Sequence, residues 1–182
     1  MNKKPNFGIN KAVFLDRDGV INKEVHYLHK IEEFEFIDGV FESLELISNH
    51  GFILVIITNQ SGIGRGIYKQ NDFDTLNSWM VKQFKNHNVA FSGIYLCPHS
   101  PSMRCLCRKP SPGLFNQAIS DLDINPEKSW VIGDSERDIL AAERAKIKNT
   151  ILVRSGHPIV EGNTRAKFIM DSIKEASRLI VG

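Results

Sequence analysis

Two groups of carboxylates stand directly after apolar runs of the chain. Asp16 and Asp18 follow the run AVFL at 12–15, and a second acidic cluster that begins at Asp134 follows another apolar run. Hard oxygen ligands from separate strand ends suit Mg²⁺, which binds few protein carboxylates and leaves room for water and phosphate. Aspartate is also common in ordinary turns, so neither cluster is specific by itself. Together the clusters predict a magnesium site at which a phosphate group could react.

All three cysteines of the chain lie in one short segment with a histidine, in the order Cys97, His99, Cys105 and Cys107. Three thiolates and one imidazole match the ligand set of a closed, tetrahedral Zn²⁺ site. Because the protein would fill all four positions, we expect the zinc to be structural. The alternative is a chance cluster of buried cysteines beside a surface histidine. An odd number of closely spaced cysteines makes a poor disulfide framework.

Two further segments carry groups suited to binding a phosphate. Arg108 and Lys109 directly follow the last cysteine, where a zinc site would fix the backbone of cations that could otherwise be solvated on a mobile loop. Lys109 would offer a point charge and Arg108 a bidentate contact. The glycine-rich segment 58–66 offers the Thr58 hydroxyl and backbone N–H groups as an anion cradle. Its glycine spacing matches neither the Walker nor the dinucleotide-binding pattern, and taken alone it is better explained as a flexible turn.

The elements that must position these residues follow from the alternation of apolar runs and helical patterns. We expect strands at 12–15, 52–57, 94–96, 129–132, 150–153 and 168–170, and helices at 39–49, 72–86, 114–122, 136–145 and 172–180. Asp38 is a candidate N-cap of the first helix. The pattern predicts an α/β fold, a doubly wound and mostly parallel sheet with helices on both faces, as one domain over 1–182. Ligands bind beyond the carboxyl ends of such strands, where the polar motifs lie.

Composition limits the partners that the chain could have. Hydrophobic residues make up 42% and charged residues 24%, with a formal net charge of +2. Lys and Arg are scattered, which argues against nucleic acid, because binding to its backbone needs a concentrated basic surface. No apolar run approaches the roughly 20 residues that cross a bilayer, and the polar start at 1–10 lacks a secretory signal. We therefore expect a cytoplasmic monomer with no nucleic-acid or membrane partner.

Four motifs, in order, resemble those of the haloacid dehalogenase superfamily of phosphohydrolases. They are DRDGV at Asp16, ITNQ with Thr58 and Asn59, RKP with Lys109, and GDSERD at Asp134. The zinc cluster before the lysine narrows the resemblance to the branch of histidinol phosphatases and heptose-bisphosphate phosphatases. The segments HYLHKIEEFEFIDGV, TNQSGIGRGIY, CRKPSPGL and LVRSGHP are similar to the heptose-bisphosphate side of that branch, so the resemblance covers nearly the whole chain.

The resemblance implies roles for individual residues. Asp16 would be the nucleophile and a Mg²⁺ ligand, Asp18 the general acid and base with its carbonyl on Mg²⁺, and Asp134 the remaining protein ligand of Mg²⁺. Thr58 and Lys109 would hold the phosphoryl oxygens. The implied substrate-binding residues are Glu24, Val25, His26, Tyr27, Asn59, Gln60, Ser61 and Arg108. The short spans between the motifs leave no room for a cap domain, so an open site is expected.

The implied reaction removes the C7 phosphate of a heptose 1,7-bisphosphate, and the heptose 1-phosphate product would serve the synthesis of lipopolysaccharide or another surface glycan. Five residues separate His99 from Cys105, as in the histidinol-phosphatase branch, so histidinol phosphate is an alternative substrate. Ser135 stands where heptose enzymes often have lysine, and Arg137 cannot be assumed to replace that cation. A polynucleotide phosphatase and a zinc-stabilised binding module without activity are the remaining alternatives, and an intact set of motifs opposes the last.

Overall fold

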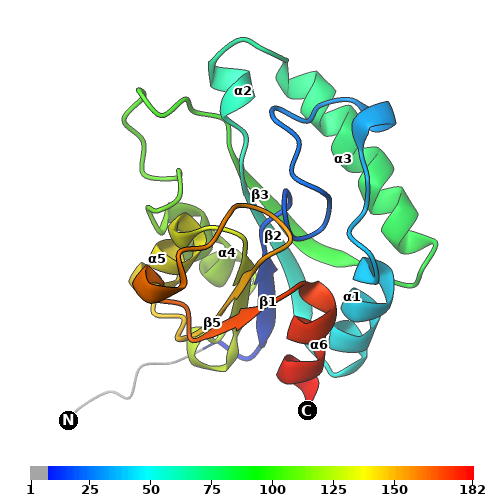
Figure 1. Ribbon diagram of the computed structural model, residues 1–182, viewed down its shortest axis with the longest axis vertical. Helices are drawn as coiled ribbons and strands as arrows, with labels where there is room; N and C mark the ends of the chain where they lie inside the picture. Colours follow the sequence, from blue (N-terminus) through cyan, green and yellow to red (C-terminus); the bar gives the residue numbers. More distant parts are fainter. Residues whose placement is uncertain (1–7) are drawn as a thin grey trace.

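The chain folds around one six-stranded sheet with the strand order β3-β2-β1-β4-β5-β6 (Figure 1). The computed structural model describes residues 8–182, so most of the polar start at 1–10 lies outside the described residues. The strands are β1 (Ala12–Leu15), β2 (Ile53–Asn59), β3 (Phe91–Cys97), β4 (Trp130–Gly133), β5 (Asn149–Val153) and β6 (Phe168–Met170). Every neighbouring pair among these strands is parallel. The predicted doubly wound sheet, including the short edge strand β6, is confirmed.

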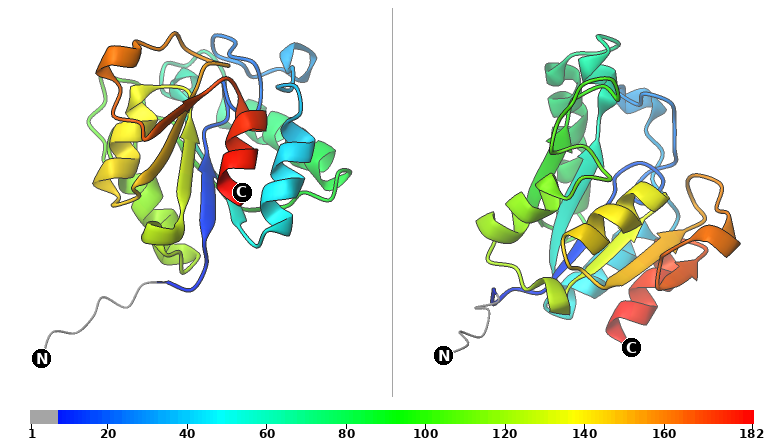
Figure 2. Two further views of the ribbon diagram at one scale, coloured as in Figure 1. Left: turned by 60° about the horizontal axis from the view of Figure 1, so that its bottom comes forward. Right: turned by 90° about the vertical axis from the view of Figure 1, so that its left-hand side faces the viewer.

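Helices cover both faces of the sheet, as two further views show (Figure 2). One face carries α1 (Val40–Asn49), α3 (Gln70–Lys85) and α6 (Ile173–Val181), and the other carries α4 (Gly113–Asp121) and α5 (Glu136–Arg144). A short helix, α2 (Ser61–Gly64), follows β2. Three single 3₁₀ turns lie at Ile31–Glu33, Pro126–Lys128 and Glu161–Asn163.

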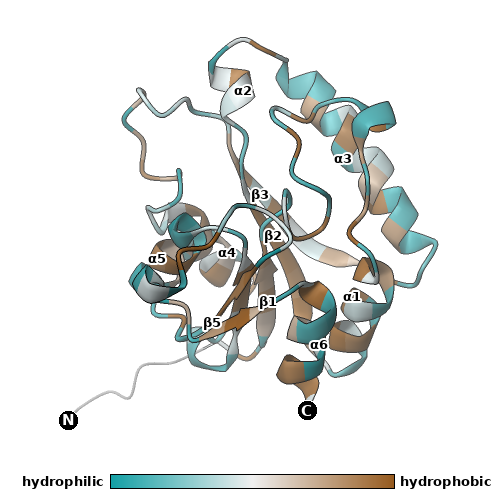
Figure 3. Ribbon diagram, viewed as in Figure 1, coloured by the Kyte–Doolittle hydropathy of each residue, from teal (hydrophilic) through white to brown (hydrophobic). Residues whose placement is uncertain are grey.

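The central strands are apolar at every position because both of their faces are covered. All four side chains of β1 are fully buried. Val13 and Leu15 pack with α1, α3 and α6, whereas Ala12 and Phe14 pack with α4 and α5. The strands are accordingly hydrophobic and the outer helix faces hydrophilic (Figure 3). A continuous apolar run is the pattern expected of a strand buried on both sides.

Several local predictions need correction. Asp38 is not the N-cap of α1: Gly39 holds that position with φ of 73°, and no side chain caps the helix. The residue directly before the helix adopts a left-handed conformation that favours glycine. The glycine-rich segment is not simply a turn, because Ser61–Gly64 is helical. β2 continues to Asn59, so Thr58 lies in the strand rather than in the loop after it.

The carboxyl ends of the parallel strands lie at one edge of the sheet, where loops follow them. No further domain of the described chain covers these loops. Within residues 8–182, the spans from Asp16 to Thr58 and from Thr58 to Lys109 contain only the elements named above, and no cap domain is inserted. In the same part of the chain, no helix combines the length and the apolar composition needed to span a membrane.

Candidate active site

Three carboxylates converge at the carboxyl ends of the two central strands. Asp16 follows β1, Asp134 follows β4, and Asp138 lies in the first turn of α5. One oxygen of each carboxylate lies within 4.8 Å of the others. Neighbouring parallel strands end at the same edge of the sheet, so carboxylates far apart in the sequence meet there. The sequence predicted Asp16 and Asp134 for this group, but it assigned no role to Asp138.

Asp134 is enclosed so tightly that two neighbouring positions must be glycine. A Cβ atom at Gly19 would lie 2.4 Å from Asp134 Oδ2, and one at Gly156 would lie 2.1 Å from it. The backbone N–H of His157 donates to the same oxygen at 3.0 Å, and His157 Nδ1 lies 2.6 Å from it. This hydrogen bond raises the pKa of His157. His157 was missed by sequence reasoning, although it belongs to the segment LVRSGHP.

Lys109 is a fully buried cation between two of these carboxylates. Its Nζ lies 2.9 Å from Asp16 Oδ2 and 2.5 Å from Asp138 Oδ1, and it donates to the carbonyl of Ile57 at 2.8 Å. Burial alone would lower the pKa of Lys109, but Asp138 and Asp16 outweigh that effect and raise it. Lys109 is therefore charged throughout the physiological range. The structure places Lys109 beside Asp16, and its contact with a phosphate stays a prediction.

The carboxylates retain an excess of negative charge despite Lys109. Burial raises the pKa of Asp16 well above its ordinary value, against the opposing effect of Lys109, and Asp138 and Asp134 raise it further. Burial and Asp138 likewise raise the pKa of Asp134. Crowded, desolvated carboxylates with raised pKa values have the electrostatics that a divalent cation relieves. The donor set therefore fits Mg²⁺.

The carboxylate of Asp18 is not part of this group of three, and it is paired with Arg17. Arg17 NH2 donates to Asp18 Oδ1 at 2.9 Å and to Oδ2 at 3.1 Å, and Arg17 Nε donates to Oδ1 at 3.2 Å. Asn22 Nδ2 donates to Oδ1 at 2.9 Å and Gln60 Nε2 to Oδ2 at 3.0 Å. Arg17 is 1% exposed, and it also donates to the carbonyl of Leu28. Sequence reasoning missed Arg17 and Asn22, because nothing in a turn sequence shows that an arginine is buried.

The predicted phosphate-binding hydroxyl of Thr58 is buried and is not among the groups that line the cavity. Its Oγ1 accepts a hydrogen bond from Gln60 Nε2 at 2.8 Å. Asn59 holds the lysine segment in place, since its Oδ1 accepts from the Lys109 backbone N–H at 3.1 Å and its Nδ2 donates to the Lys109 carbonyl at 3.3 Å. Asn59 therefore joins the end of β2 to the lysine loop.

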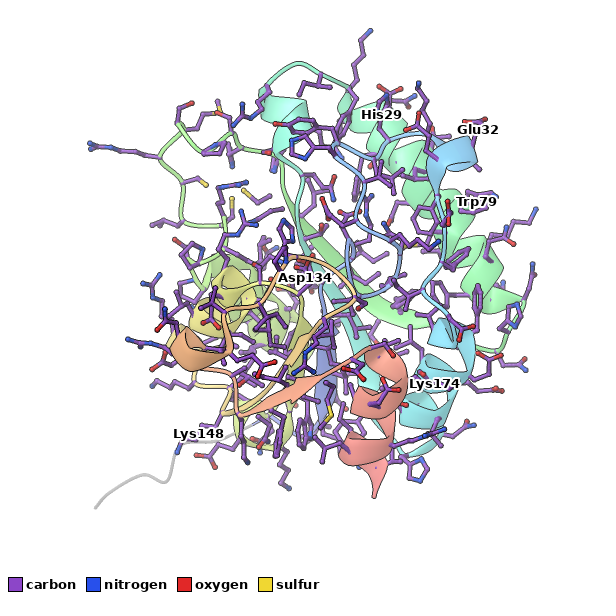
Figure 4. All side chains as sticks on the ribbon, viewed as in Figure 1. His29, Glu32, Trp79, Asp134, Lys148 and Lys174 are labelled. Carbon is purple, nitrogen blue, oxygen red and sulfur yellow. The ribbon has the colours of Figure 1, made fainter. Side chains whose placement is uncertain are left out.

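These groups form the floor and walls of a cavity of about 280 Å³. Asp134, labelled near the middle of Figure 4, belongs to its lining. The predicted residues in the lining are Asp16, Asp18, Glu24, Val25, His26, Tyr27, Asn59, Gln60, Ser61, Arg108, Lys109 and Asp134. Residues in the lining without a predicted role include Arg65, Tyr68, Arg137, Asp138 and His157. The structure thus brings nearly the whole predicted set together around one cavity.

Three arginines in the cavity wall, Arg65, Arg108 and Arg137, have no carboxylate partner within the described residues 8–182. Arg108 donates to the carbonyl of His99, at 3.4 Å, and Arg137 to Ser135 Oγ, at 3.4 Å. Three guanidinium groups without counter-ions in one cavity wall favour a ligand that carries an anionic group.

The predicted zinc ligands meet at one point beside this cavity. Cys97 Sγ lies 3.8 Å from Cys105 Sγ and 3.5 Å from His99 Nδ1, and Cys107 Sγ lies 3.2 Å from both Cys97 Sγ and His99 Nδ1. Tetrahedral Zn²⁺ with bonds of about 2.3 Å to sulfur and about 2.0 Å to nitrogen places its ligand atoms roughly 3.5–3.8 Å apart. The cluster comes close to that spacing. Burial raises the pKa of Cys97 to about 12, so a thiolate there needs a cation beside it.

Comparisons with known proteins agree with this geometry. Residues 106–176 match the sequence model of the HAD-hydrolase-like family. The crystal structure of D,D-heptose 1,7-bisphosphate phosphatase from B. bronchiseptica, complexed with magnesium and phosphate, superposes with a TM-score of 0.88 at 25% identity, covering 94% of this chain and 98% of that one. The chain is therefore a phosphatase of the haloacid dehalogenase type.

Curated relatives define the particular family. D-glycero-beta-D-manno-heptose-1,7-bisphosphate 7-phosphatase of Pasteurella multocida strain Pm70 is 44% identical, over 96% of this chain and 98% of the relative. D-glycero-alpha-D-manno-heptose-1,7-bisphosphate 7-phosphatase of Photorhabdus laumondii is 42% identical, over 93% and 96%. The chain belongs to the family of D-glycero-D-manno-heptose-1,7-bisphosphate 7-phosphatases.

Proposed function

We propose that this phosphatase hydrolyses the C7 phosphate of a D-glycero-D-manno-heptose 1,7-bisphosphate and releases heptose 1-phosphate for the synthesis of lipopolysaccharide or a similar glycan. One observation carries the proposal most directly. The buried group of Asp16, Asp134, Asp138 and Lys109 lines a cavity whose wall also holds three arginines without counter-ions. A sugar with phosphates at both ends would place one at the carboxylates and the other near Arg108.

In the first step, Asp16 attacks the phosphorus of the C7 phosphate. The bond between phosphorus and the sugar oxygen breaks, its electron pair stays on that oxygen, and the oxygen takes a proton from Asp18. In the second step, water attacks the phosphorus of the aspartyl-phosphate and gives its proton back to Asp18. The bond to Asp16 then breaks, which frees the carboxylate and inorganic phosphate.

The chain's own cations and donors stabilise the transferring group. Lys109, fixed between Asp16 and Asp138, faces the phosphoryl oxygens as a positioned charge. Asp16, Asp134 and the carbonyl of Asp18 would hold Mg²⁺, which supplies charge stabilisation to the phosphoryl group when bound. Asp138 belongs to the same group as the counter-ion of Lys109.

We also propose that Cys97, His99, Cys105 and Cys107 bind a structural Zn²⁺. The four ligand atoms lie within 4.8 Å of one another, and the set leaves no position for a reacting water. The Arg108 guanidinium donates to the His99 carbonyl, so the zinc loop and the substrate-facing arginine are one unit. Zinc would therefore act by holding Arg108 and Lys109 in place. Thiolate ligands fit an enzyme that works in the reducing cytoplasm. The proposed enzyme is a monomer of one domain, with a small molecule as its partner.

The experiment that tests the function compares kcat/KM for the alpha and beta anomers of heptose 1,7-bisphosphate and for histidinol phosphate, in the same Mg²⁺ buffer. One charge-assisted contact from Arg108 to the distal phosphate corresponds to about a tenfold to hundredfold preference for the bisphosphate. Phosphorus NMR should show that the phosphate at C1 remains on the sugar.

Asp16→Asn is the control for this assay, because it keeps the shape of the nucleophile but cannot form the aspartyl-phosphate. Its turnover should fall by several orders of magnitude while its melting temperature stays near that of the wild type. Equal or faster turnover of histidinol phosphate, or release of phosphate from C1, would overturn the proposed substrate. Substantial turnover by Asp16→Asn would reject Asp16 as the nucleophile.

A further inference from the structure

A buried chain of hydrogen bonds leads from Tyr68, two residues before α3, to Asp18. The Tyr68 hydroxyl donates to Gln60 Oε1 at 2.6 Å. Gln60 Nε2 in turn donates to Thr58 Oγ1 at 2.8 Å and to Asp18 Oδ2 at 3.0 Å. Gln60 is 3% and Tyr68 is 5% exposed, so bulk water does not compete for these contacts. Both hydrogens of the Gln60 amide are used within the protein.

The direction of this chain follows from the chemistry of its end groups. A carboxylate only accepts, so the nitrogen of the Gln60 amide must face Asp18 and the oxygen must face Tyr68. A tyrosine hydroxyl keeps its proton at working pH, and burial raises the pKa of Tyr68 to about 12. The donated hydrogen bond from Tyr68 therefore favours the one amide orientation that places a donor on Asp18.

The position of the Tyr68 ring is set by packing on two sides. A Cβ atom at Gly62 would lie 2.1 Å from Cε1 of the ring, so only glycine lets the ring approach α2 this closely. On another side the ring stacks on His29, with centroids 5.0 Å apart and an interplanar angle of 4°. His29 is labelled in Figure 4. The hydroxyl is thus held at a defined place relative to Gln60.

We propose that Tyr68 is a positioning residue, which fixes the orientation of the Gln60 amide and thereby the place of the Asp18 carboxyl group. The inference rests on the proposed role of Asp18 as general acid. The Gln60 contact ties Asp18 to the end of β2, whereas the contacts from Arg17 and Asn22 tie it to its own loop. A proton donor is effective only where it reaches the departing oxygen, so losing one of these ties slows the step that needs the proton.

The test uses Tyr68→Phe, which removes the hydroxyl and keeps the ring, with two substrates that differ in their need for an acid. The sugar oxygen of heptose bisphosphate needs a proton as it departs, whereas the nitrophenolate of p-nitrophenyl phosphate is stable without one. For a two-step enzyme, kcat/KM reports the steps up to the aspartyl-phosphate. We expect kcat/KM for the sugar to fall about tenfold, mainly through kcat, and that for the aryl phosphate by less than about threefold.

Tyr95→Phe is the matched control, because it removes a tyrosine hydroxyl that bonds to Asp121 at 3.2 Å outside the cavity lining. It should leave both substrates unaffected. Gln60→Glu is the second variant: it keeps the size of the side chain but presents an oxygen to Asp18 where the nitrogen was. It should lower the ratio of sugar to aryl turnover further than Tyr68→Phe does.

Each outcome decides between the two proposals. If the wild type does not hydrolyse heptose bisphosphate, the proposed function fails, whatever the variants do. If the wild type is active and Tyr68→Phe loses the same factor on both substrates, or loses nothing, the positioning role of Tyr68 is wrong. If Tyr68→Phe does not fold, the ratio measured with Gln60→Glu decides: an unchanged ratio overturns the inference and a lowered ratio supports it.

Discussion

Asp138→Asn should destabilise the fold as well as the site, because one oxygen of Asp138 is paired with a buried cation and the other accepts two hydrogen bonds. One oxygen pairs with buried Lys109 at 2.5 Å, and the other accepts from the backbone N–H of Ser135 at 3.1 Å and from its hydroxyl at 3.2 Å. Asparagine has only one acceptor atom and carries no charge. Whichever way the new amide turns, either Lys109 or the N-terminus of α5 loses its partner.

The size of the effect follows from these contacts. A charge-assisted hydrogen bond contributes about 1.5–3 kcal/mol, and a helix cap about 1 kcal/mol. Loss of the negative charge beside a buried lysine adds to whichever contact is lost, so we expect a loss of about 3 kcal/mol. For a domain of this size, that corresponds to a fall in melting temperature of roughly 6–12 °C. Lys109 would then have Asp16 as its one carboxylate partner, and Mg²⁺-dependent turnover should fall too.

The assay is thermal unfolding in EDTA, followed by circular dichroism, with Glu143→Gln as the matched control. Glu143 also lies in α5 and pairs with Arg165 at 3.1 Å, but both side chains are more than half exposed. Exposed pairs contribute about 0–1 kcal/mol, so this control should shift the melting temperature by at most about 4 °C. If Asp138→Asn melts at the same temperature as Glu143→Gln, the reasoning about the buried pair is refuted.

Two further predictions concern the zinc loop and the last helix. Purified protein should contain about one zinc per chain by elemental analysis. Cys105→Ala should lower the zinc content and reduce kcat/KM, because Arg108 and Lys109 would be misplaced. A zinc-free wild type with full activity in Mg²⁺ buffer would contradict this prediction. The Ser172 hydroxyl donates to Glu175 at 2.6 Å, and this hydrogen bond lowers the pKa of Glu175. The charged carboxylate therefore stabilises α6 at pH values above the ordinary pKa of glutamate. That contribution is lost as the pH falls through the lowered pKa. Glu175→Gln should therefore cost about 1 kcal/mol in urea unfolding at about pH 7 and less at about pH 3, whereas a difference that is independent of pH would count against the charged cap.

The fold class and most of the residues around the cavity could be predicted from the sequence. Buried strands of a parallel sheet must be continuously apolar, so β1 and β2 were visible as runs, and Asp16 and Asp134 could be placed at strand ends. The spacing of Cys97, His99, Cys105 and Cys107 also predicted that these four side chains lie together, because groups so close in the chain need little help from the fold to meet.

Which polar groups face one another could be seen only in the folded protein. Asp138 has the sequence signature of an ordinary helix N-terminus, and it is the counter-ion of Lys109 because α5 begins over the end of β4. His157 reaches Asp134 because two glycines let the backbones approach that carboxylate closely. Arg17 contacts Asp18 directly, and Tyr68 reaches it through Gln60, because packing sets the direction of these buried side chains. Periodicity in a sequence reports which face of an element is covered, whereas the pairing of single polar atoms depends on the distances that close packing sets.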